Sequence, residues 1–573
     1  MQKSLINPPF SFLFIATLFA ISTVFAENLV SNLTNFQVIQ RTSETFADIP
    51  VSGYHDFSVG SHIQARICQQ INNEVLKNFD WETVDTSFSS MTWKGVIHHV
   101  PVGGEYSIQF SLLIFENQPA KPFATIEHLL VGDIWGAGGQ SNMLGEGDVS
   151  LSDKPIDQVH MITLDTGWQK AREPIGGVGC GPALRFALKV YAETSIPMGL
   201  AFYAVGGTLM SFWQKGTVGF NNWSSVLNSA GGNIKGIIWY QGEANVVNYL
   251  QDADIYKSQM KAFMSDTRTS LNNPGLPWIL AQIATVCDNE GITPDFLMIV
   301  REAQRELPLE DQNATTITTA DLPRQDCFHF ATPQYQTIGN RFAAAALNKI
   351  YGRKDQLLGP RFSSAYFNDT ANKTILILTK DISGEIIVSD TPSDFFVINN
   401  GLKQNPISIV RKDTSSILLT FNQQLSSNST VGFGFGCDPT NLNCSDMSQI
   451  VLQPFYNQPI MDIRKGIKQI SSPDSQSIRK TTSLENKIDI TVKQNPFNLY
   501  ALFSISFSEI KTNSAELSIV NINGMSLRRI RLSIGQNRIS LSKKFLPAGC
   551  YVLCIFDGQR NGTTKMILTG AHV

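Results

Sequence analysis

The stretch Leu129-Leu-Val-Gly-Asp-Ile-Trp-Gly-Ala-Gly-Gly-Gln-Ser-Asn-Met143 marks a change in the pattern of the sequence. Before it, in residues 27–128, short runs of alternating apolar residues separated by turn residues predict an N-terminal β-sandwich domain. Residues 129–352 instead alternate strand-like apolar runs with helical periodicity. This alternation predicts an α/β domain, a doubly wound parallel sheet with helices on both faces.

The apolar runs locate the elements of this sheet. The expected helices cover Pro182–Glu193, Ile255–Thr267, Phe296–Leu307 and Gln336–Ile350. In an open parallel sheet, ligands bind at the carboxyl ends of the strands, so residues just after each strand are candidates for a site. The expected strands are Leu129–Ala137, Gly199–Val205, Ile234–Tyr240, Trp278–Ile283 and Thr315–Ala320.

Three short motifs directly follow expected strands. Ser141 comes after a Gly-Gly-Gln turn, where its hydroxyl can stand at a helix N-terminus and its own N–H can point at an oxyanion. Gly206 begins a Gly-Gly-Thr motif, and glycine leaves backbone N–H groups unobstructed. Gln241, in Gln-Gly-Glu, offers a side-chain amide as a further donor.

A fourth motif, Asp326-Cys-Phe-His329, lies between the last expected strand and the last expected helix. His329 suits a general base, and Asp326 can hold one ring nitrogen while the other faces Ser141. Taken singly, each motif has an ordinary explanation, such as a turn serine or a surface carboxylate at Glu243. Their occurrence in this order at successive strand ends favours a nucleophilic serine site.

The motifs GQSN, GGT, QGE and DxxH in this order resemble the SGNH (GDSL-type) hydrolase superfamily, and specifically its sialate O-acetylesterase-like carbohydrate acetylesterases. The resemblance covers residues 35–460. Val131-Gly-Asp-Ile-Trp is similar to the first strand of that family, and Gln37-Val-Ile-Gln-Arg is similar to the β-domain that often precedes it.

The resemblance implies roles for individual residues. Ser141 would be the nucleophile, His329 the base and Asp326 its orienting partner. The oxyanion hole would consist of the N–H groups of Ser141 and Gly206 together with Gln241. Glu243 or Asn245 could take the place of Gln241 in that hole.

The activity implied is that of a serine esterase that removes O-acetyl groups from carbohydrates through an acetyl-enzyme, without a metal or other cofactor. O-acetylated sialic acids are the first expected substrates. Arg301 would then face the sugar carboxylate, unless it is an exposed helix residue, and Glu243 is a second candidate for substrate contact. Acetylxylan is the alternative substrate, because residues 326–330 (DCFHF) are closer to acetylxylan esterases. A carbohydrate-binding or adhesion protein is the non-catalytic alternative.

The two ends of the chain predict export. Residues 1–26 contain Lys3, an apolar stretch and a Val-Phe-Ala end, as in a cleaved signal peptide. Beyond the catalytic domain we expect a β-rich accessory domain over 353–465 and a linker over 466–486. Residues 487–573 resemble a C-terminal sorting domain of type IX secretion, which could attach the protein to the cell surface. We expect this domain to be a β-sandwich with a hairpin at Asn523-Gly524.

Composition excludes other classes. The formal net charge is −3 and only 16% of residues are charged, which gives no electrostatic case for nucleic acid or an anionic membrane surface. Beyond the signal peptide no stretch could span a bilayer. The cysteines show no zinc spacing, and Cys437 could pair locally with Cys444.

Overall fold

The structure, a computed structural model, describes residues 29–462 except 55–61, 89–91, 114–121, 248–249, 288–293, 390–393 and 440–441, together with separate segments between 490 and 568. The chain forms two compact units, Met1–Asp462 and Ile463–Val573, and each is described by itself. The expected signal peptide and linker lie outside the described residues.

The N-terminal part is made of β-strands. One sheet has the order β1-β3-β7-β6, and β4 pairs with β5 and β8. Buried side chains alternate along β3 and β4, and they pack around Trp93 and Phe110. The strands are β1 (Leu29–Val30), β2 (Val38–Gln40), β3 (Phe46–Tyr54), β4 (His62–Gln69), β5 (Glu82–Thr83), β6 (Asp85–Phe88), β7 (Thr92–Pro101) and β8 (Gly103–Leu113).

The strand β9 (Pro122–Gly139) connects this part to the next. Its first half pairs antiparallel with β8, and its second half pairs in parallel with two strands of the central sheet. The sequence boundary expected between residues 128 and 129 therefore falls inside one continuous strand. The strand ends at Gly139, so it delivers Ser141 directly to the edge of the central sheet.

The central sheet has the order β11-β10-β12-β9-β13-β14-β15. All neighbours are parallel except β10 and β11. Every residue of β13, β14 and β15 is buried, so both faces of these strands are covered. The bounds are β10 (Val159–Thr163), β11 (Gln169–Lys170), β12 (Met198–Ala204), β13 (Gly236–Tyr240), β14 (Trp278–Ala281) and β15 (Ala314–Ile317).

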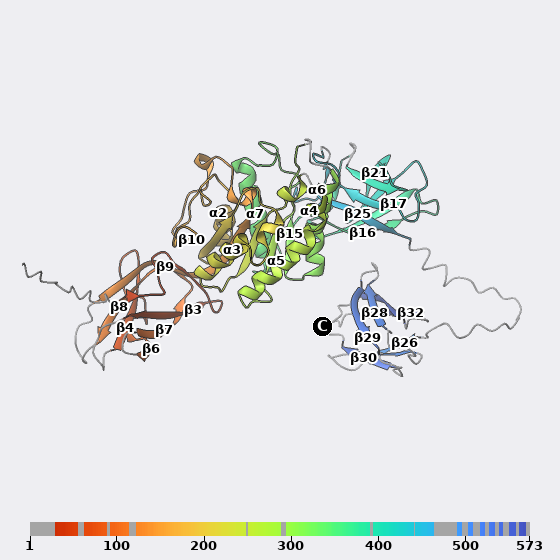
Figure 1. Cartoon of the computed structure of the whole chain (residues 1–573). Helices are drawn as coiled ribbons and strands as arrows, with labels where there is room; N and C mark the ends of the chain where they lie inside the picture. Colours follow the sequence, from red (N-terminus) through yellow and green to blue (C-terminus); the bar gives the residue numbers. More distant parts are fainter. Residues whose placement is uncertain are drawn as a thin grey trace, which may run out of the picture. The chain divides into compact units, whose positions relative to one another are not determined.

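Helices alternate with these strands along the chain and pack their apolar sides into the same core (Figure 1). In α3, buried Phe220, Trp223 and Leu227 recur at helical spacing. The α-helices are α1 (Ser141–Leu144), α2 (Ala183–Thr194), α3 (Val218–Ser229), α4 (Leu250–Asp254), α5 (Tyr256–Ser270), α6 (Pro294–Glu310) and α7 (Thr332–Lys349). The short 3₁₀ turns are η1 (Val149–Leu151), η2 (Met210–Trp213) and η3 (Glu243–Val246).

After α7 the chain forms an eight-stranded sheet with the order β20-β19-β23-β25-β16-β17-β22-β21. Its core contains stacked rings of Phe362 and Phe455, whose centroids lie 4.3 Å apart. The strands are β16 (Arg361–Phe367), β17 (Thr374–Lys380), β18 (Ile387–Val388), β19 (Phe395–Asn399), β20 (Leu402–Gln404), β21 (Ser408–Asp413), β22 (Ser416–Thr420), β23 (Thr430–Phe433), β24 (Cys444–Ser445) and β25 (Phe455–Met461).

The second unit contains a three-stranded and a four-stranded antiparallel sheet. Two of its strands, β28 and β29, pair antiparallel on either side of the expected Asn523-Gly524 turn, which lies outside the described residues. The strands are β26 (Ile490–Gln494), β27 (Leu502–Phe507), β28 (Glu516–Asn521), β29 (Ser526–Arg531), β30 (Arg538–Ser542), β31 (Gly549–Phe556) and β32 (Asn561–Leu568).

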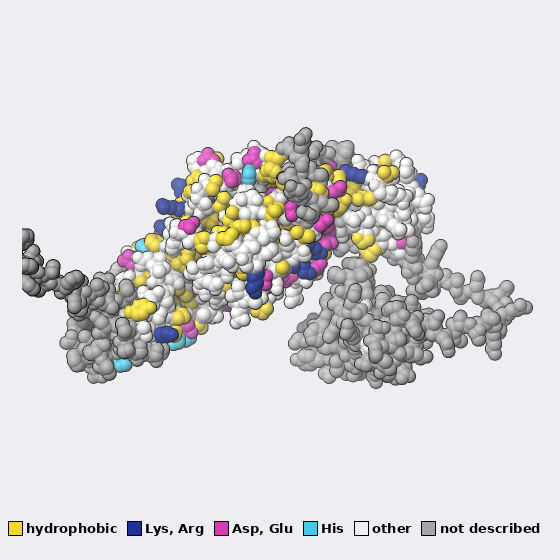
Figure 2. All heavy atoms as spheres, in the orientation of Figure 1, with side chains coloured by type: hydrophobic (Ala, Val, Ile, Leu, Met, Phe, Trp, Pro, Cys, Tyr) yellow, Lys and Arg dark blue, Asp and Glu magenta, His cyan; other side chains and the backbone are white. Residues whose placement is uncertain are grey.

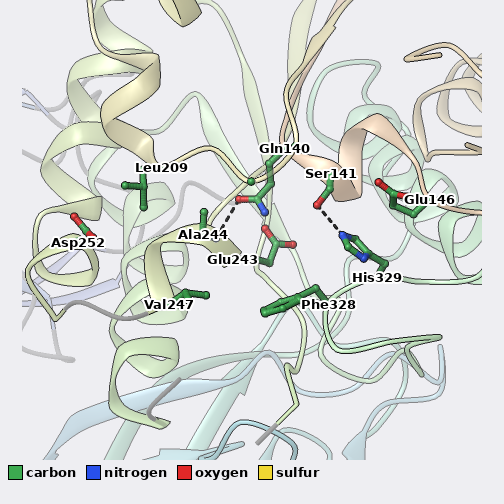
Figure 3. A pocket seen from close by; sticks show the side chains of 12 residues that line it. Gln140, Ser141, Glu146, Leu209, Glu243, Ala244, Val247, Asp252, Phe328 and His329 are labelled. Atoms are coloured by element: carbon green, nitrogen blue, oxygen red, sulfur yellow. Dashed lines mark hydrogen bonds between the residues drawn. The ribbon is translucent and has the colours of Figure 1, made fainter. Parts of the chain in front are cut away.

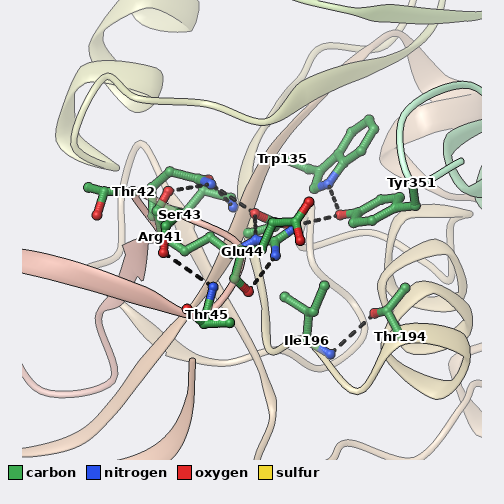
Figure 4. A network of polar contacts seen from close by, with 12 residues as sticks. Arg41, Thr42, Ser43, Glu44, Thr45, Trp135, Thr194, Ile196 and Tyr351 are labelled. Atoms are coloured by element: carbon green, nitrogen blue, oxygen red, sulfur yellow. Dashed lines mark hydrogen bonds and ion pairs between the residues drawn. The ribbon is translucent and has the colours of Figure 1, made fainter. Parts of the chain in front are cut away.

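A buried ion pair joins the N-terminal strands to the central sheet (Figure 4). Arg41 donates two hydrogen bonds to the carboxylate of Asp133, at 2.8 and 2.9 Å. Gln40 and the hydroxyl of Tyr351 donate to the same carboxylate. The side chain of Asp133 is fully buried, so these donors replace the water that it has lost.

On the face of the molecule drawn in Figure 2, acidic and basic side chains are scattered singly or in small groups.

Candidate active site

Three of the predicted residues meet at the carboxyl edge of the central sheet. Ser141 is the first residue of α1, and both Asp326 and His329 lie in the loop between β15 and α7. The Nε2 atom of His329 is 2.9 Å from the Oγ of Ser141 (Figure 3), and its Nδ1 is 2.9 Å from the Oδ2 of Asp326. This is the geometry of a serine nucleophile with a histidine base that a carboxylate orients.

The Asp326 carboxylate also shapes the loop that carries the base. Its Oδ1 accepts hydrogen bonds from the backbone N–H groups of Phe328 and His329, at 2.8 and 2.7 Å. Burial acts to raise the pKa of Asp326, but these two bonds and the imidazole bond outweigh it, so its pKa is lowered. The Asp326 carboxylate is therefore ionised and can accept a hydrogen bond from the His329 imidazole.

The turn before Ser141 requires glycine. Gly139 has φ +145°, and a Cβ at this position would lie 1.9 Å from the carbonyl oxygen of Tyr240. Next to it, the side chain of Gln140 accepts hydrogen bonds from the N–H groups of Gly242 and Ala244. These contacts fasten the Gln-Gly-Glu segment to the turn before Ser141, a role for Gln140 that the sequence alone did not indicate.

Gly206, the second expected oxyanion donor, is a neighbour of Ser141 in the pocket. It follows the end of β12 and lines the same pocket as Ser141. A Cβ on Gly206 would lie 3.7 Å from the Cβ of Ser141, so the two residues are neighbours.

Gln241 does not occupy the position that the resemblance implied. Its amide donates to the carbonyl of Thr208 and to the Oδ1 of Asn245, and the residue is fully buried behind the pocket lining. Asn245, the alternative oxyanion donor, already has a partner within the protein, since its amide donates to the carbonyl of Asp252. The structure does not place Gln241 as an oxyanion donor, because its side-chain amide donates to Thr208 and to Asn245.

Glu243 does reach the pocket. It is 3% exposed, lines the cavity, and lies beside Ser141 and His329 in Figure 3. Its Oε1 accepts a hydrogen bond of 2.6 Å from Asn142, whereas its Oε2 has no hydrogen-bond partner among the described residues. Burial raises the pKa of Glu243.

The cavity around these residues has a volume of about 590 Å³, which is large enough for a small molecule. Among its described lining residues are three acidic side chains and no Lys or Arg. No group of three or more His, Cys, Asp or Glu placed to hold a metal ion occurs among the described residues. The full lining is Gln140, Ser141, Glu146, Gly206, Gly207, Leu209, Glu243, Ala244, Val247, Asp252, Phe328 and His329.

Comparison with known proteins identifies the catalytic part. Residues 131–348 match the family model of carbohydrate esterases described as sialic acid-specific acetylesterases. A probable carbohydrate esterase of Arabidopsis thaliana is 31% identical over 241 residues, 37% of this chain and 89% of the plant protein. The chain belongs to this carbohydrate esterase family. It is therefore a carboxylic ester hydrolase.

Two further proteins are similar to parts of this chain. Human sialate O-acetylesterase is 22% identical over 233 residues, which span 32% of this chain and 43% of the human protein. A carbohydrate acetylesterase from Xanthomonas citri shares the fold, with a TM-score of 0.58 at 19% identity, over 75% of this chain and 99% of that one.

The C-terminal part matches a different family. Residues 495–569 match the secretion system C-terminal sorting domain, as the sequence predicted. This domain indicates that the esterase is secreted and located at the cell surface or outside the cell. Among the described residues, no helix is long and apolar enough to cross a membrane.

Arg301 of the esterase is neither a substrate contact nor an exposed helix residue, so both interpretations are corrected. It lies in α6 with no exposed surface and is absent from the described pocket lining. Its guanidinium donates to the carbonyl oxygens of Ile283 and Gly434. Burial lowers the pKa of Arg301 to about 10, and the side chain links the segment after β14 to the eight-stranded sheet.

The cysteine prediction is also corrected. No disulfide joins Cys437 to Cys444 in this structure. A disulfide instead joins Cys287 to Cys327, 40 residues further along the chain. Cys327 is part of the Asp326–His329 motif, and no pattern in the sequence indicated this long-range pairing.

Proposed function

We propose that this protein is a secreted serine esterase that removes O-acetyl groups from carbohydrates through an acetyl-enzyme on Ser141. The observation that carries the proposal is the continuous hydrogen-bonded series from Ser141 through His329 to Asp326, with both contacts at 2.9 Å. A non-catalytic carbohydrate-binding protein has no need of this arrangement.

The catalytic cycle follows from these positions. His329 Nε2 takes the proton of the Ser141 hydroxyl as Oγ attacks the acetyl carbonyl carbon. The N–H groups of Ser141 and Gly206 stabilise the resulting oxyanion. His329 then gives the proton to the departing sugar oxygen. In the second half-reaction it deprotonates water, which attacks the acetyl-serine and releases acetate.

Asp326 has a supporting role in both halves of the cycle. Its carboxylate holds the Nδ1 proton of His329, so that Nε2 faces Ser141 without a proton in the resting enzyme. It also stabilises the imidazolium that forms when His329 accepts a proton. We further propose Glu243 as a substrate contact, since its unpartnered Oε2 is placed to bind a sugar hydroxyl.

The charge of the pocket lining bears on which acetylated sugar is the substrate. O-acetylated sialic acids are suggested by the description of the matched family, and they carry a carboxylate. The pocket, however, is lined by Glu146, Glu243 and Asp252 without a described Lys or Arg. An anionic sugar would meet like charge there. The pocket therefore supports a neutral acetylated sugar, such as the acetylated xylose units of acetylxylan, as the second candidate substrate.

The test compares acetate release by the mature protein from 9-O-acetylated sialic acid and from acetylxylan. Glu146→Gln and Asp252→Asn reduce the negative charge of the pocket, and Glu44→Gln is a matched control in the N-terminal part. If the pocket excludes anionic sugars, wild type prefers acetylxylan, and the two pocket variants gain kcat/KM only for the sialic acid. Preference of wild type for the sialic acid would contradict the neutral-sugar assignment. Release from neither substrate would contradict the proposed function for these sugars.

We also propose the organisation of the whole chain. A signal peptide over 1–26 precedes a β-sandwich domain over 27–128 and an SGNH-type catalytic domain over 129–352, whose sheet is doubly wound. A β-rich accessory domain over 353–465 and a linker over 466–486 lead to the sorting domain over 487–573, which serves for surface attachment. Expression of residues 27–465 as a fragment without the signal peptide and the sorting domain tests this division, with retained acetate release as the expected result.

A further inference from the structure

The Cys287–Cys327 disulfide is attached to the loop that carries the catalytic base. Cys327 follows Asp326 and precedes His329 by two positions. Its partner Cys287 lies in the segment after β14, and the two Cα atoms are 4.8 Å apart. The N–H of Cys287 also donates to the carbonyl oxygen of Cys327 at 3.1 Å. The covalent bond thus ties the loop that carries His329 to the segment that follows β14.

Other contacts reinforce the same attachment. Arg324 donates to the carbonyl of Cys327 at 2.7 Å and to the hydroxyl of Thr285 at 2.9 Å. It also pairs with Asp438 of the eight-stranded part, at 3.1 Å. The N–H of Val286 donates to the carbonyl of Cys437 at 2.8 Å. The segment 285–287 therefore has contacts with Arg324 and with Cys437, and it provides a fixed support for Cys327.

The loop needs such a support. It lies between β15 and α7 and is itself part of neither a strand nor a helix. The side chain of Asp326 is 51% exposed, and hydrogen bonds and ion pairs in contact with water contribute little rigidity. A catalytic constellation must be held to within about 0.5 Å of its productive geometry. Neither cysteine lines the pocket, so the disulfide can act only through the position of the loop.

We propose that the Cys287–Cys327 disulfide is a positioning element, which keeps His329 within reach of Ser141 and makes esterase turnover dependent on the oxidised state. This inference rests on the proposed serine mechanism. Reduction by a dithiol breaks the S–S bond, yields two thiols on the protein and converts the reductant to its own disulfide. Export to an oxidising compartment, which the sorting domain indicates, supplies the conditions under which the bond persists.

The experiment compares wild type, Cys287→Ser, Cys327→Ser and the double variant, each with and without dithiothreitol. Three quantities are measured: kcat and KM for acetate release, the rate at which a fluorophosphonate labels Ser141, and the midpoint of thermal unfolding. The labelling rate reports activation of the serine by His329, and a purely structural bond would leave it unchanged in folded protein. Cys180→Ala, a buried cysteine outside the disulfide, is the matched control.

We expect kcat and the labelling rate of the double variant to fall by about 10²-fold, the cost of a misplacement of roughly 1 Å, with KM nearly unchanged. Dithiothreitol should lower kcat and the labelling rate of folded wild type and of Cys180→Ala to the values of the double variant. It should leave the double variant unaffected. Equal kcat and equal labelling in wild type and the double variant would overturn the inference, as would free thiols at Cys287 and Cys327 on peptide mapping.

The two proposals fail in different ways. A wild type that releases no acetate from any acetylated sugar contradicts the proposed function, whereas the labelling comparison still tests the positioning role. An active wild type with an equally active double variant contradicts the positioning role alone. If the double variant does not fold, reduction of the folded wild type provides the same comparison.

Discussion

The Nε2 atom of His329 lies 2.9 Å from the Oγ atom of Ser141, although 188 residues separate the two in the sequence. The sheet accounts for this meeting, because β9 and β15 run in the same direction and end at the same edge. Ser141 comes directly after β9, and the loop after β15 returns across this edge with His329. Asn142 bonds the carbonyl of Phe328 at 3.0 Å and so fastens that loop to the nucleophile helix.

Asp326→Asn should reduce kcat by about 10⁴-fold, because an amide can hold the wrong tautomer of His329. Half of the Asp326 side chain is exposed, so the variant should fold and keep the unfolding midpoint of wild type. Steady-state acetate release and thermal unfolding check this. Asp148→Asn, which removes a carboxylate that caps η1 outside the triad, is the matched control. Equal kcat in wild type and Asp326→Asn would show that the carboxylate has no part in turnover.

Gly206 offers a test of the oxyanion hole with two substitutions at one position. Gly206→Ala retains the N–H, and its Cβ would meet Ser141 only at van der Waals distance, so we expect nearly unchanged turnover. Gly206→Pro removes the N–H, and kcat should fall by about 10²–10³-fold. Acetate release by both variants, each verified as folded by circular dichroism, checks the pair. A comparable loss in the alanine variant would indicate a steric effect and not a lost donor.

Much of the fold could be predicted from the sequence, because parallel strands that are buried on both faces appear in it as continuous runs of apolar residues. The expected strand Ile234–Tyr240 is found as β13, Gly236–Tyr240, and the expected helix Gln336–Ile350 as α7, Thr332–Lys349. The helix α3 was not expected, although Phe220, Trp223 and Leu227 carried its periodicity.

The positions of buried polar side chains could not be predicted in the same way. The resemblance placed Gln241 in the oxyanion hole, and Arg301 was expected to face a sugar carboxylate. Both residues instead donate to backbone carbonyls on other segments, which only the tertiary structure brings close. The Cys287–Cys327 bond is a second example, since its two loops are 40 residues apart. Motifs at strand ends were predictable because the sheet itself gathers them at one edge.

The buried pair of Arg41 and Asp133 should stabilise the attachment of the N-terminal strands without affecting catalysis. Arg41→Met leaves a fully buried carboxylate with only two donors, and we expect the free energy of unfolding to fall by about 3–5 kcal/mol. Neither residue lines the active-site pocket, so kcat should be unchanged. Urea unfolding checks the change. Arg411→Met, which removes an exposed pair with Glu385, is the control and should have little effect.

Glu173 should make stability depend on pH in a defined direction. Burial raises the pKa of Glu173 from 4.5 to about 7, so the folded state keeps a proton that the unfolded state has lost between these values. The contribution of this residue to the free energy of unfolding therefore falls as the pH rises from 4.5 to 7. Glu173→Gln should match wild type at pH 4 and be more stable than wild type at pH 8, as denaturant unfolding will show. A stability difference that does not change with pH would contradict the burial argument.

The proposed mechanism requires that Ser141 carries the acetyl group during turnover. Mass spectrometry of peptides from acid-quenched reactions of wild type, Ser141→Ala and Ser265→Ala with an activated acetyl ester tests this requirement. We expect one acetyl group on the Ser141 peptide of wild type and of Ser265→Ala. We expect no acetyl group on Ser141→Ala, together with a loss of acetate release of about 10⁴-fold or more. Undiminished acetate release by folded Ser141→Ala would show that Ser141 is not the nucleophile.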